Sequence, residues 1–239
     1  MKNRFLIGLH HGLPIGLGYL SVSFAFGIFS LGQGLSIWET LLISMTNLTS
    51  AGQLAGVPII AVGGSAAELA VTQLVINLRY SLMSVSLSQK LDSSVKLKDR
   101  FLIAFVNTDE VFAVASGQPG KVGRYYLFGL IVAPYIGWSS GTLLGTVASG
   151  LLPASVMTAL GIAIYGMFVA IVIPPAKKSR AVALVLGGAV ALACAFRYIP
   201  VLSQVSGGFV IIICAVTAAA LGAVFAPIPE ADEREEESA

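Results

Sequence analysis

The amino-acid sequence predicts an all-α polytopic membrane protein, and three observations lead to that class. The chain has 239 residues, of which 56% are hydrophobic and only 11% are charged, whereas about 25% of an ordinary soluble domain is charged. Its mean hydropathy is +0.87. Its apolar residues form runs that are too long for barrel strands and lack their alternation. A soluble chain could not cover itself with so few charges, and a disordered chain is excluded because low hydrophobicity is typical of disorder.

The chain has room for seven to eight hydrophobic helical segments, since a membrane-spanning helix needs about 20 residues. The apolar runs lie at 13–31, 39–62, 66–89, 101–117, 124–148, 152–174, 181–196 and 203–226. The connections between them are short, so we expect a single transmembrane domain over residues 1–229. Residues 230–239 hold six of the twelve acidic residues of the chain, and we expect them to form a disordered tail.

The first run, 13–31, is expected to be a retained membrane helix. It follows Lys2 and Arg4 as a signal peptide would, but no small-residue cleavage site fits well. The two histidines, His10 and His11, precede this run, and we expect them at the membrane interface.

The basic residues conflict with a chain of plain spans. Lys and Arg cluster at 2–4, 90–100, 121–124 and 177–180. Such clusters mark the cytoplasmic side, so an even number of crossings should separate each pair. Three runs separate the first cluster from the second, and one run separates the second from the third. Both conflicts vanish if the second run, 39–62, and the fourth run, 101–117, each enter and leave on the same side.

These two runs are also the most polar of the eight. Their middles carry Asn47, Thr49, Ser50, Gly52 and Gln53 in one, and Asn107, Thr108, Asp109 and Glu110 in the other. Interrupted helices are tolerated in a membrane where protein or a water-filled cavity satisfies the backbone, and they often form transporter substrate sites. We expect both runs to be broken or re-entrant and to converge on one polar cavity. The alternative is seven or eight plain spans with an imperfect charge bias.

The third run, 66–89, is polar on two faces of a helical wheel. Glu68 and Arg79 share one face, and Gln73 and Asn77 lie on the opposite face. A helix polar on two sides is expected to line a pathway inside the protein.

Arg79 lies near the middle of its run, where a charge costs about 2.5–3.5 kcal/mol on insertion scales. It therefore needs a carboxylate from another helix, and Asp109 and Glu110 are the natural candidates. Adjacent helical residues point about 100° apart, so we expect one of them to pair with Arg79 and the other to be available to a proton. The alternative is a purely structural ion pair.

The fifth run, 124–148, has glycine at every fourth position, at Gly137, Gly141 and Gly145. Small residues with this spacing let helix backbones approach closely in lipid. We expect a tightly packed helix here, and membrane helices in the three runs that follow.

Several function classes find no support in the sequence. It has no metal-ligand cluster, no Ser/His/Asp set, no phosphate-binding loop and no dinucleotide fingerprint, so we expect no enzyme activity and no cofactor. Its basic residues form no single patch, so we expect no nucleic-acid partner. A secondary transporter is favoured, and a passive channel or a non-transporting membrane subunit are the alternatives. The candidate substrate-binding or coupling residues are Asn47, Thr49, Ser50, Gln53, Glu68, Asn77, Arg79, Asp109 and Glu110.

The chain also resembles a known family over about residues 10–225. The matching elements are Leu13-Pro14-Ile15-Gly16, Ala25-Phe26-Gly27, Thr49-Ser50-Ala51-Gly52-Gln53-Leu54, Asn77-Leu78-Arg79-Tyr80 and Thr108-Asp109-Glu110-Val111-Phe112-Ala113. Together they resemble the AzlC family, the large subunit of the AzlCD branched-chain amino acid exporter. The resemblance implies a multi-pass protein of a prokaryotic cytoplasmic membrane, proton-driven export of amino acids such as valine and leucine, and a small AzlD-like membrane subunit as partner. Gly52, Leu54 and Tyr80 stand where the family commonly has Ser, Phe and His, so the substrate stays open.

Overall fold

The computed structural model describes residues 2–153, 155, 156, 159, 166, 169 and 172–225. The chain divides into two compact units, Met1–Met167 and Phe168–Ala239. The described residues form helices and no sheet, with one isolated bridge between Leu91 and Val122. The predicted all-α class is confirmed.

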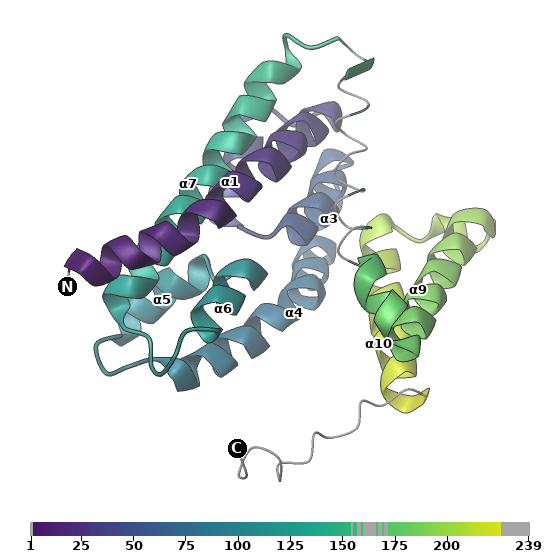
Figure 1. Cartoon of the computed structure of the whole chain (residues 1–239). Coiled ribbons are helices and arrows are strands. Elements are labelled where there is room, and N and C mark those ends of the chain that lie inside the picture. Colours follow the sequence, from purple (N-terminus) through teal and green to yellow (C-terminus); the bar gives the residue numbers. More distant parts are fainter. Residues whose placement is uncertain are drawn as a thin grey trace. The chain divides into compact units, whose positions relative to one another are not determined.

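The first unit contains seven described α-helices (Figure 1). They are α1 (Lys2–Gly32), α2 (Ile37–Thr46), α3 (Ser50–Ala61), α4 (Ala66–Lys90), α5 (Leu97–Phe105), α6 (Asp109–Ser116) and α7 (Arg124–Ser149). The long helices α1 and α7 lie side by side and form a frame, and the shorter helices α2, α5 and α6 pack against α7.

Glycines hold the frame together at very short range. A Cβ atom on Gly137 would lie 2.2 Å from the carbonyl oxygen of Gly16, and one on Gly145 would lie 2.1 Å from that of Phe24. No larger residue fits at such distances without moving a backbone, so the tight packing predicted from the glycine spacing is confirmed.

Helix α1 begins at Lys2, eleven residues before the predicted start of the first run. Its first turns pack on α7, where a Cβ atom on Gly8 would lie 2.0 Å from the carbonyl oxygen of Tyr126. His11 lies within the helix, with its Nδ1 atom 2.9 Å from the Tyr126 hydroxyl. His10 and His11 therefore lie within the first helix and not before it, and their expected position at the membrane interface stays a prediction.

Both runs that were predicted to be broken are broken. The second run forms α2 and α3, separated by residues 47–49, and the fourth run forms α5 and α6, separated by residues 106–108. At the first break Thr49 caps α3, because its hydroxyl accepts the backbone N–H of Gly52 at 3.4 Å. Short polar side chains that bond to nearby backbone favour such helix starts over a continuous helix.

Helix α4 is uninterrupted over 25 residues and packs on α3 after a tight turn at Gly63, whose φ is 69°. The Ser65 hydroxyl accepts the backbone N–H of Glu68 at the start of the helix. Between the two helices, Gln73 Nε2 donates to the Gly52 carbonyl at 2.8 Å, and a Cβ atom on Gly52 would lie 2.6 Å from Gln73 Oε1. Glycine at position 52 therefore lets a polar side chain of α4 reach the α3 backbone.

The predicted count of seven to eight spans is not confirmed. Among the described residues, four helices are long and apolar enough to cross a membrane, namely Arg4–Gly32, Arg124–Ser149, Arg180–Tyr198 and Gly207–Phe225. The half-helices α2, α3, α5 and α6 are too short to cross alone, and α4 is long enough but more polar. Much of the sixth predicted run, 152–174, lies outside the described residues.

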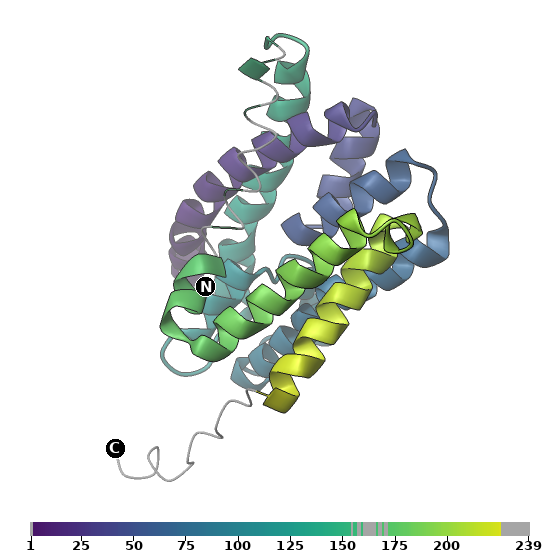
Figure 2. The ribbon, with the colours of Figure 1, turned by 90° about the vertical axis from the view of Figure 1, so that its right-hand side faces the viewer.

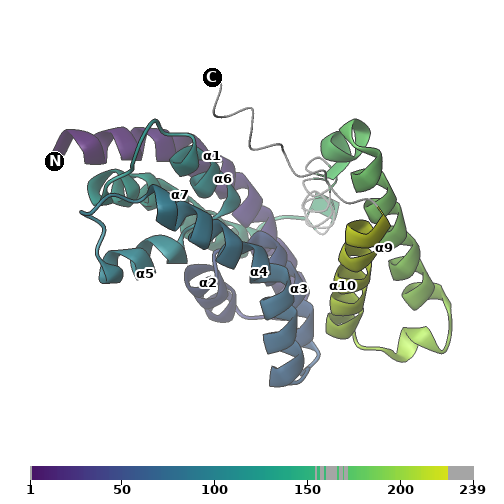
Figure 3. The ribbon, with the colours of Figure 1, turned by 90° about the horizontal axis from the view of Figure 1, so that it is seen from below.

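The second unit contains α9 (Arg180–Tyr198), the short 3-10 helix η1 (Leu202–Gln204) and α10 (Gly207–Phe225). Helices α9 and α10 run side by side (Figures 2 and 3). The single transmembrane domain expected over 1–229 stays a prediction, and the acidic tail at 230–239 lies outside the described residues.

Candidate functional site

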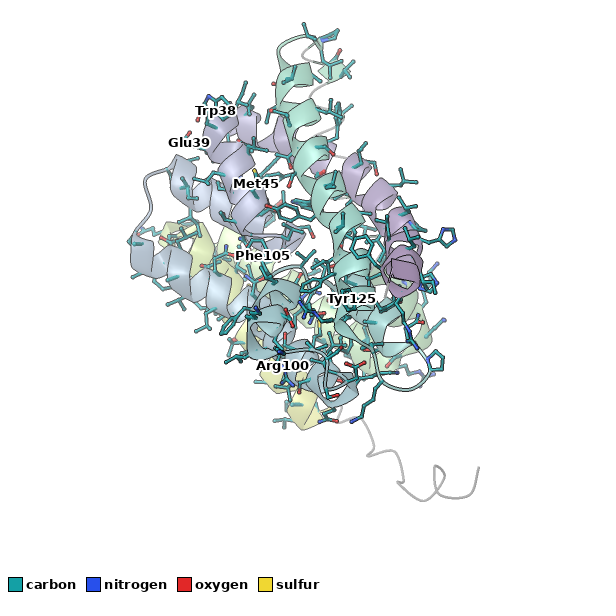
Figure 4. All side chains as sticks on the ribbon, turned by 90° about the vertical axis from the view of Figure 1, so that its left-hand side faces the viewer. Trp38, Glu39, Met45, Arg100, Phe105 and Tyr125 are labelled. Atoms are coloured by element: carbon teal, nitrogen blue, oxygen red, sulfur yellow. The ribbon has the colours of Figure 1, made fainter. Side chains whose placement is uncertain are left out.

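The two helix breaks meet at one pocket, as the sequence predicted. The pocket has a volume of about 250 Å³. It is lined by Thr46, Asn47, Leu48 and Thr49 at the first break, by Asn77 and Tyr80 of α4, and by Ala104, Phe105, Asn107 and Thr108 at the second break. Met45 and Phe105, labelled in Figure 4, each lie near the end of the half-helix that precedes its break. Both lie against Tyr135 of α7, whose hydroxyl donates to the Met45 carbonyl at 3.3 Å and whose ring centre lies 6.2 Å from that of Phe105. The packing of α2 and α5 on α7 therefore brings distant polar segments to one place.

Two asparagine side chains in the pocket wall have an amide oxygen without a hydrogen-bond donor among the described residues. Asn107 is only 3% exposed, and its Nδ2 donates to Ser84 Oγ at 3.4 Å. Asn77 Nδ2 donates to the Gln73 backbone carbonyl at 2.9 Å. In the described part of the chain, the Oδ1 atoms of Asn77 and Asn107 are buried without a hydrogen-bond partner. Buried polar atoms are normally satisfied, so these oxygens are positioned to accept from a bound group.

Gln73 joins the first break to α4. Its Oε1 atom accepts from Asn47 Nδ2 at 3.3 Å and from Asn77 Nδ2 at 3.1 Å. The helical wheel had placed Gln73 on the same face as Asn77, and its polarity was the signal for its role here. This network sets the orientation of both asparagines at the pocket.

The ion pair predicted for Arg79 is present. Its Nη1 atom lies 2.6 Å from Asp109 Oδ2, and both side chains are 46% exposed. The guanidinium also stacks near Tyr80, with Cζ 4.9 Å from the ring centre, and donates to the Tyr80 hydroxyl at 3.2 Å. A half-exposed charge pair in such an apolar protein requires polar surroundings, because charges are costly in lipid.

The second carboxylate at the start of α6 has a different partner. The Tyr19 hydroxyl of α1 donates to Glu110 and lies 2.7 Å from Thr108 Oγ1. The Tyr19 ring packs edge-on against Trp138 at 5.2 Å between ring centres. Sequence reasoning missed Tyr19, although a buried tyrosine hydroxyl usually finds a partner. Asp109 and Glu110 are thus held apart by α4 and α1.

Six predicted site residues do not line the pocket, namely Ser50, Gln53, Glu68 and the charged residues Arg79, Asp109 and Glu110. Gln53 is 1% exposed, and its Nε2 donates to Ser44 Oγ at 2.8 Å, which ties α3 to α2. Glu68 is buried near the start of α4, away from the pocket wall, and Ser50 also lies outside that wall. No group of three or more His, Cys, Asp or Glu side chains able to hold a metal occurs among the described residues.

The two helix starts at the pocket carry different charge. Helix α3 has no acidic residue in its first turn, whereas α6 begins with Asp109 and Glu110. A helix N-terminus is partly positive and has free backbone N–H groups. The α3 start therefore favours an anionic group, whereas the acids of α6 lie next to the pocket without lining it. The free Oδ1 atoms of Asn77 and Asn107 in the pocket wall can accept from a cationic group, so the pocket can hold a zwitterion in one orientation.

Comparison with known proteins gives one family and several relatives. The family model described as "AzlC protein" matches residues 14–152. The chain is 34% identical over 191 residues to an "Uncharacterized membrane protein" of Archaeoglobus fulgidus, covering 79% of this chain and 84% of that one. It is 30% identical over 196 residues to "Inner membrane protein YgaZ" of Escherichia coli, covering 78% and 80%. No solved structure matches the chain.

Proposed function

This chain belongs to the AzlC protein family, and from that premise we propose that it is a secondary transporter that exports branched-chain or similar small apolar amino acids. It works in the cytoplasmic membrane of a prokaryote, couples export to protons and acts with a small AzlD-like subunit. The inner-membrane name of the relative YgaZ supports the location. The observation that carries the proposal is the pocket between the two helix breaks.

The pocket suits a small amino acid. Its volume, about 250 Å³, lies below the roughly 300–1,000 Å³ of typical ligand pockets. The start of α3 would receive the substrate carboxylate, and the free Oδ1 atoms of Asn77 and Asn107 would accept from its ammonium group. Phe105 and Leu48 offer an apolar wall for its side chain.

The two carboxylates of α6 would have different roles in proton coupling. Asp109 is paired with Arg79, so its charge is already balanced. Glu110 is bound by the neutral Tyr19 hydroxyl and is exposed, so it is the better candidate to take up and release a proton. Arg79 would serve as the counter-charge of Asp109.

Leucine and valine transport tests the function. Cells that lack the protein should retain more intracellular leucine or valine than cells that regain it with its small subunit, and a protonophore should remove the difference. No change in retention would overturn the function. Export that persists after the gradient is collapsed would favour a passive channel.

The variant Glu110→Gln tests the coupling site in liposomes that contain both subunits. We expect leucine counterflow to continue while accumulation driven by a pH gradient is lost. The matched control is Glu39→Gln, which neutralises an exposed carboxylate at the start of α2 outside the pocket wall and should keep both activities. Gradient-driven accumulation by Glu110→Gln would assign the proton to another group.

A further inference from the structure

A second pocket adjoins the proposed substrate site. It has a volume of about 270 Å³ and lies between the C-terminal half of α4 and α5. Ala104 and Asn107 line both pockets. The two pockets therefore share a wall at these residues, where Asn107 has its amide nitrogen bonded to Ser84 and its Oδ1 atom free of any partner in the described chain.

The second pocket combines apolar walls with one cation. Leu87 and Ile103 are almost fully buried in its wall, and Ser84 and Ser88 add hydroxyl groups. Arg100 lines it and is exposed. In the described part of the chain, the guanidinium of Arg100 belongs to neither of the two ion pairs, which join Arg79 to Asp109 and Arg124 to Asp99.

We propose that this second pocket is an entry site, where an amino acid with an apolar side chain binds before it passes Asn107 into the pocket between the helix breaks. Arg100 holds the substrate carboxylate, the apolar wall receives the side chain, and the free Oδ1 atom of Asn107 accepts from the ammonium group. A guanidinium is well suited to bind a carboxylate with two hydrogen bonds. This inference rests on the proposed function.

The position of Arg100 in the chain agrees with export. Arg100 belongs to the basic segment 90–100, which the positive-inside rule assigns to the cytoplasm. In Figure 4, Phe105 lies between Met45 and Arg100, so α5 runs from the basic end toward the breaks. An exporter must take its substrate from the cytoplasm, and this path leads from there to the proposed substrate site.

Thiol protection tests the entry site directly. The full chain with its small subunit is used in inside-out vesicles, after Cys194 and Cys214 are replaced by alanine. Single cysteines are then placed at Ser88 in the second pocket, at Thr46 in the first pocket, and at Lys98, which lines neither pocket. A membrane-impermeant thiol reagent is added with and without saturating L-leucine.

We expect leucine to remove most of the modification at Ser88→Cys and at Thr46→Cys, and none at Lys98→Cys. Protection at Thr46→Cys without protection at Ser88→Cys would overturn the entry site and leave the proposed function standing. Protection at neither position would overturn both.

A kinetic test guards against a cysteine variant that fails to fold. Arg100→Gln should raise the KM for leucine at the cytoplasmic face about tenfold, the loss expected for one charge-assisted contact, with little change in kcat. Lys98→Gln removes the same charge from a neighbouring exposed position and should leave KM unchanged. Equal KM values in the two variants would contradict the role of Arg100.

Discussion

The frame of α1 and α7 differs from the four half-helices that it carries. In the frame, two continuous helices meet through glycines, and backbone contacts leave no room for a single added Cβ atom. In α2, α3, α5 and α6, the helices stop at polar residues, and side-chain hydrogen bonds such as Gln53 to Ser44 hold the pieces. Close backbone packing resists rearrangement, whereas a few side-chain hydrogen bonds can be exchanged. The comparison assigns rigidity to the frame and substrate handling to the broken helices.

The largest effect on stability is expected in the frame. Gly145→Leu should strongly destabilise the protein, by at least the roughly 1–3 kcal/mol typical of overpacking, because its Cβ atom would lie 2.1 Å from a carbonyl oxygen of α1. Thermal unfolding of the solubilised protein measures the change. Gly18→Leu is the matched control, since a Cβ atom there meets nothing within 4 Å. Equal stability of the two variants would show that the frame is looser than the glycine contacts indicate.

The next effect concerns function rather than folding. Asp109→Asn should abolish leucine transport while expression stays normal, and Arg79→Ala should abolish it and also lower stability, because it leaves a carboxylate without its partner. Exchanging the two residues, with aspartate at 79 and arginine at 109, should restore part of the transport. Normal transport by both single variants would remove the ion pair from the mechanism.

A smaller effect separates a structural amide from a binding amide. Gln53→Ala should lower stability by about 1–3 kcal/mol, because it leaves Ser44 without that donor, and the KM for leucine should not change. Asn77→Ala, at the pocket wall, should raise KM with a smaller loss of stability. A raised KM in Gln53→Ala would indicate that Gln53 takes part in substrate binding, as the sequence predicted.

The smallest effect is expected at the exposed start of α2. The hydroxyl and the backbone N–H of Ser36 donate to the Glu39 carboxylate and hold the pKa of Glu39 below its ordinary value of 4.5. Because the folded protein favours the ionised form, this contribution to stability is present above the ordinary pKa and is lost as the pH falls through the lowered value. Unfolding temperatures measured against pH should show a slightly steeper acid loss for the wild type than for Glu39→Gln. Identical slopes would mean that the hydrogen bonds between Ser36 and Glu39 do not contribute to stability.

The sequence predicted both helix breaks because their cause is local. Asn47 and Thr49 at one break, and Asn107 and Thr108 at the other, interrupt otherwise apolar runs, and short polar side chains favour helix starts and turns. The charge distribution pointed to the same two runs independently. The predicted number of spans is not confirmed among the described residues, and apolar composition alone does not show where a helix stops.

Partner choice within the site was beyond the reach of the sequence. Composition and spacing indicated that one carboxylate would meet Arg79, but either Asp109 or Glu110 satisfied the helical wheel. The rotation of α6 against α4 and α1 places Asp109 next to Arg79 and places Glu110 next to the Tyr19 hydroxyl. The same packing turned Gln53 away from the pocket toward Ser44.

The sequence by itself determined the membrane class, the family, the positions of the helix breaks and the need of Arg79 for a carboxylate. These follow from polarity, charge and motif along the chain. Only the tertiary structure decided which residues line the pocket that the two breaks share, that Tyr19 reaches Glu110, and that a second pocket with Arg100 adjoins the first at Asn107. The reason is physical: a side chain's polarity is a local property, whereas its neighbours depend on how helices rotate and pack around the frame of α1 and α7.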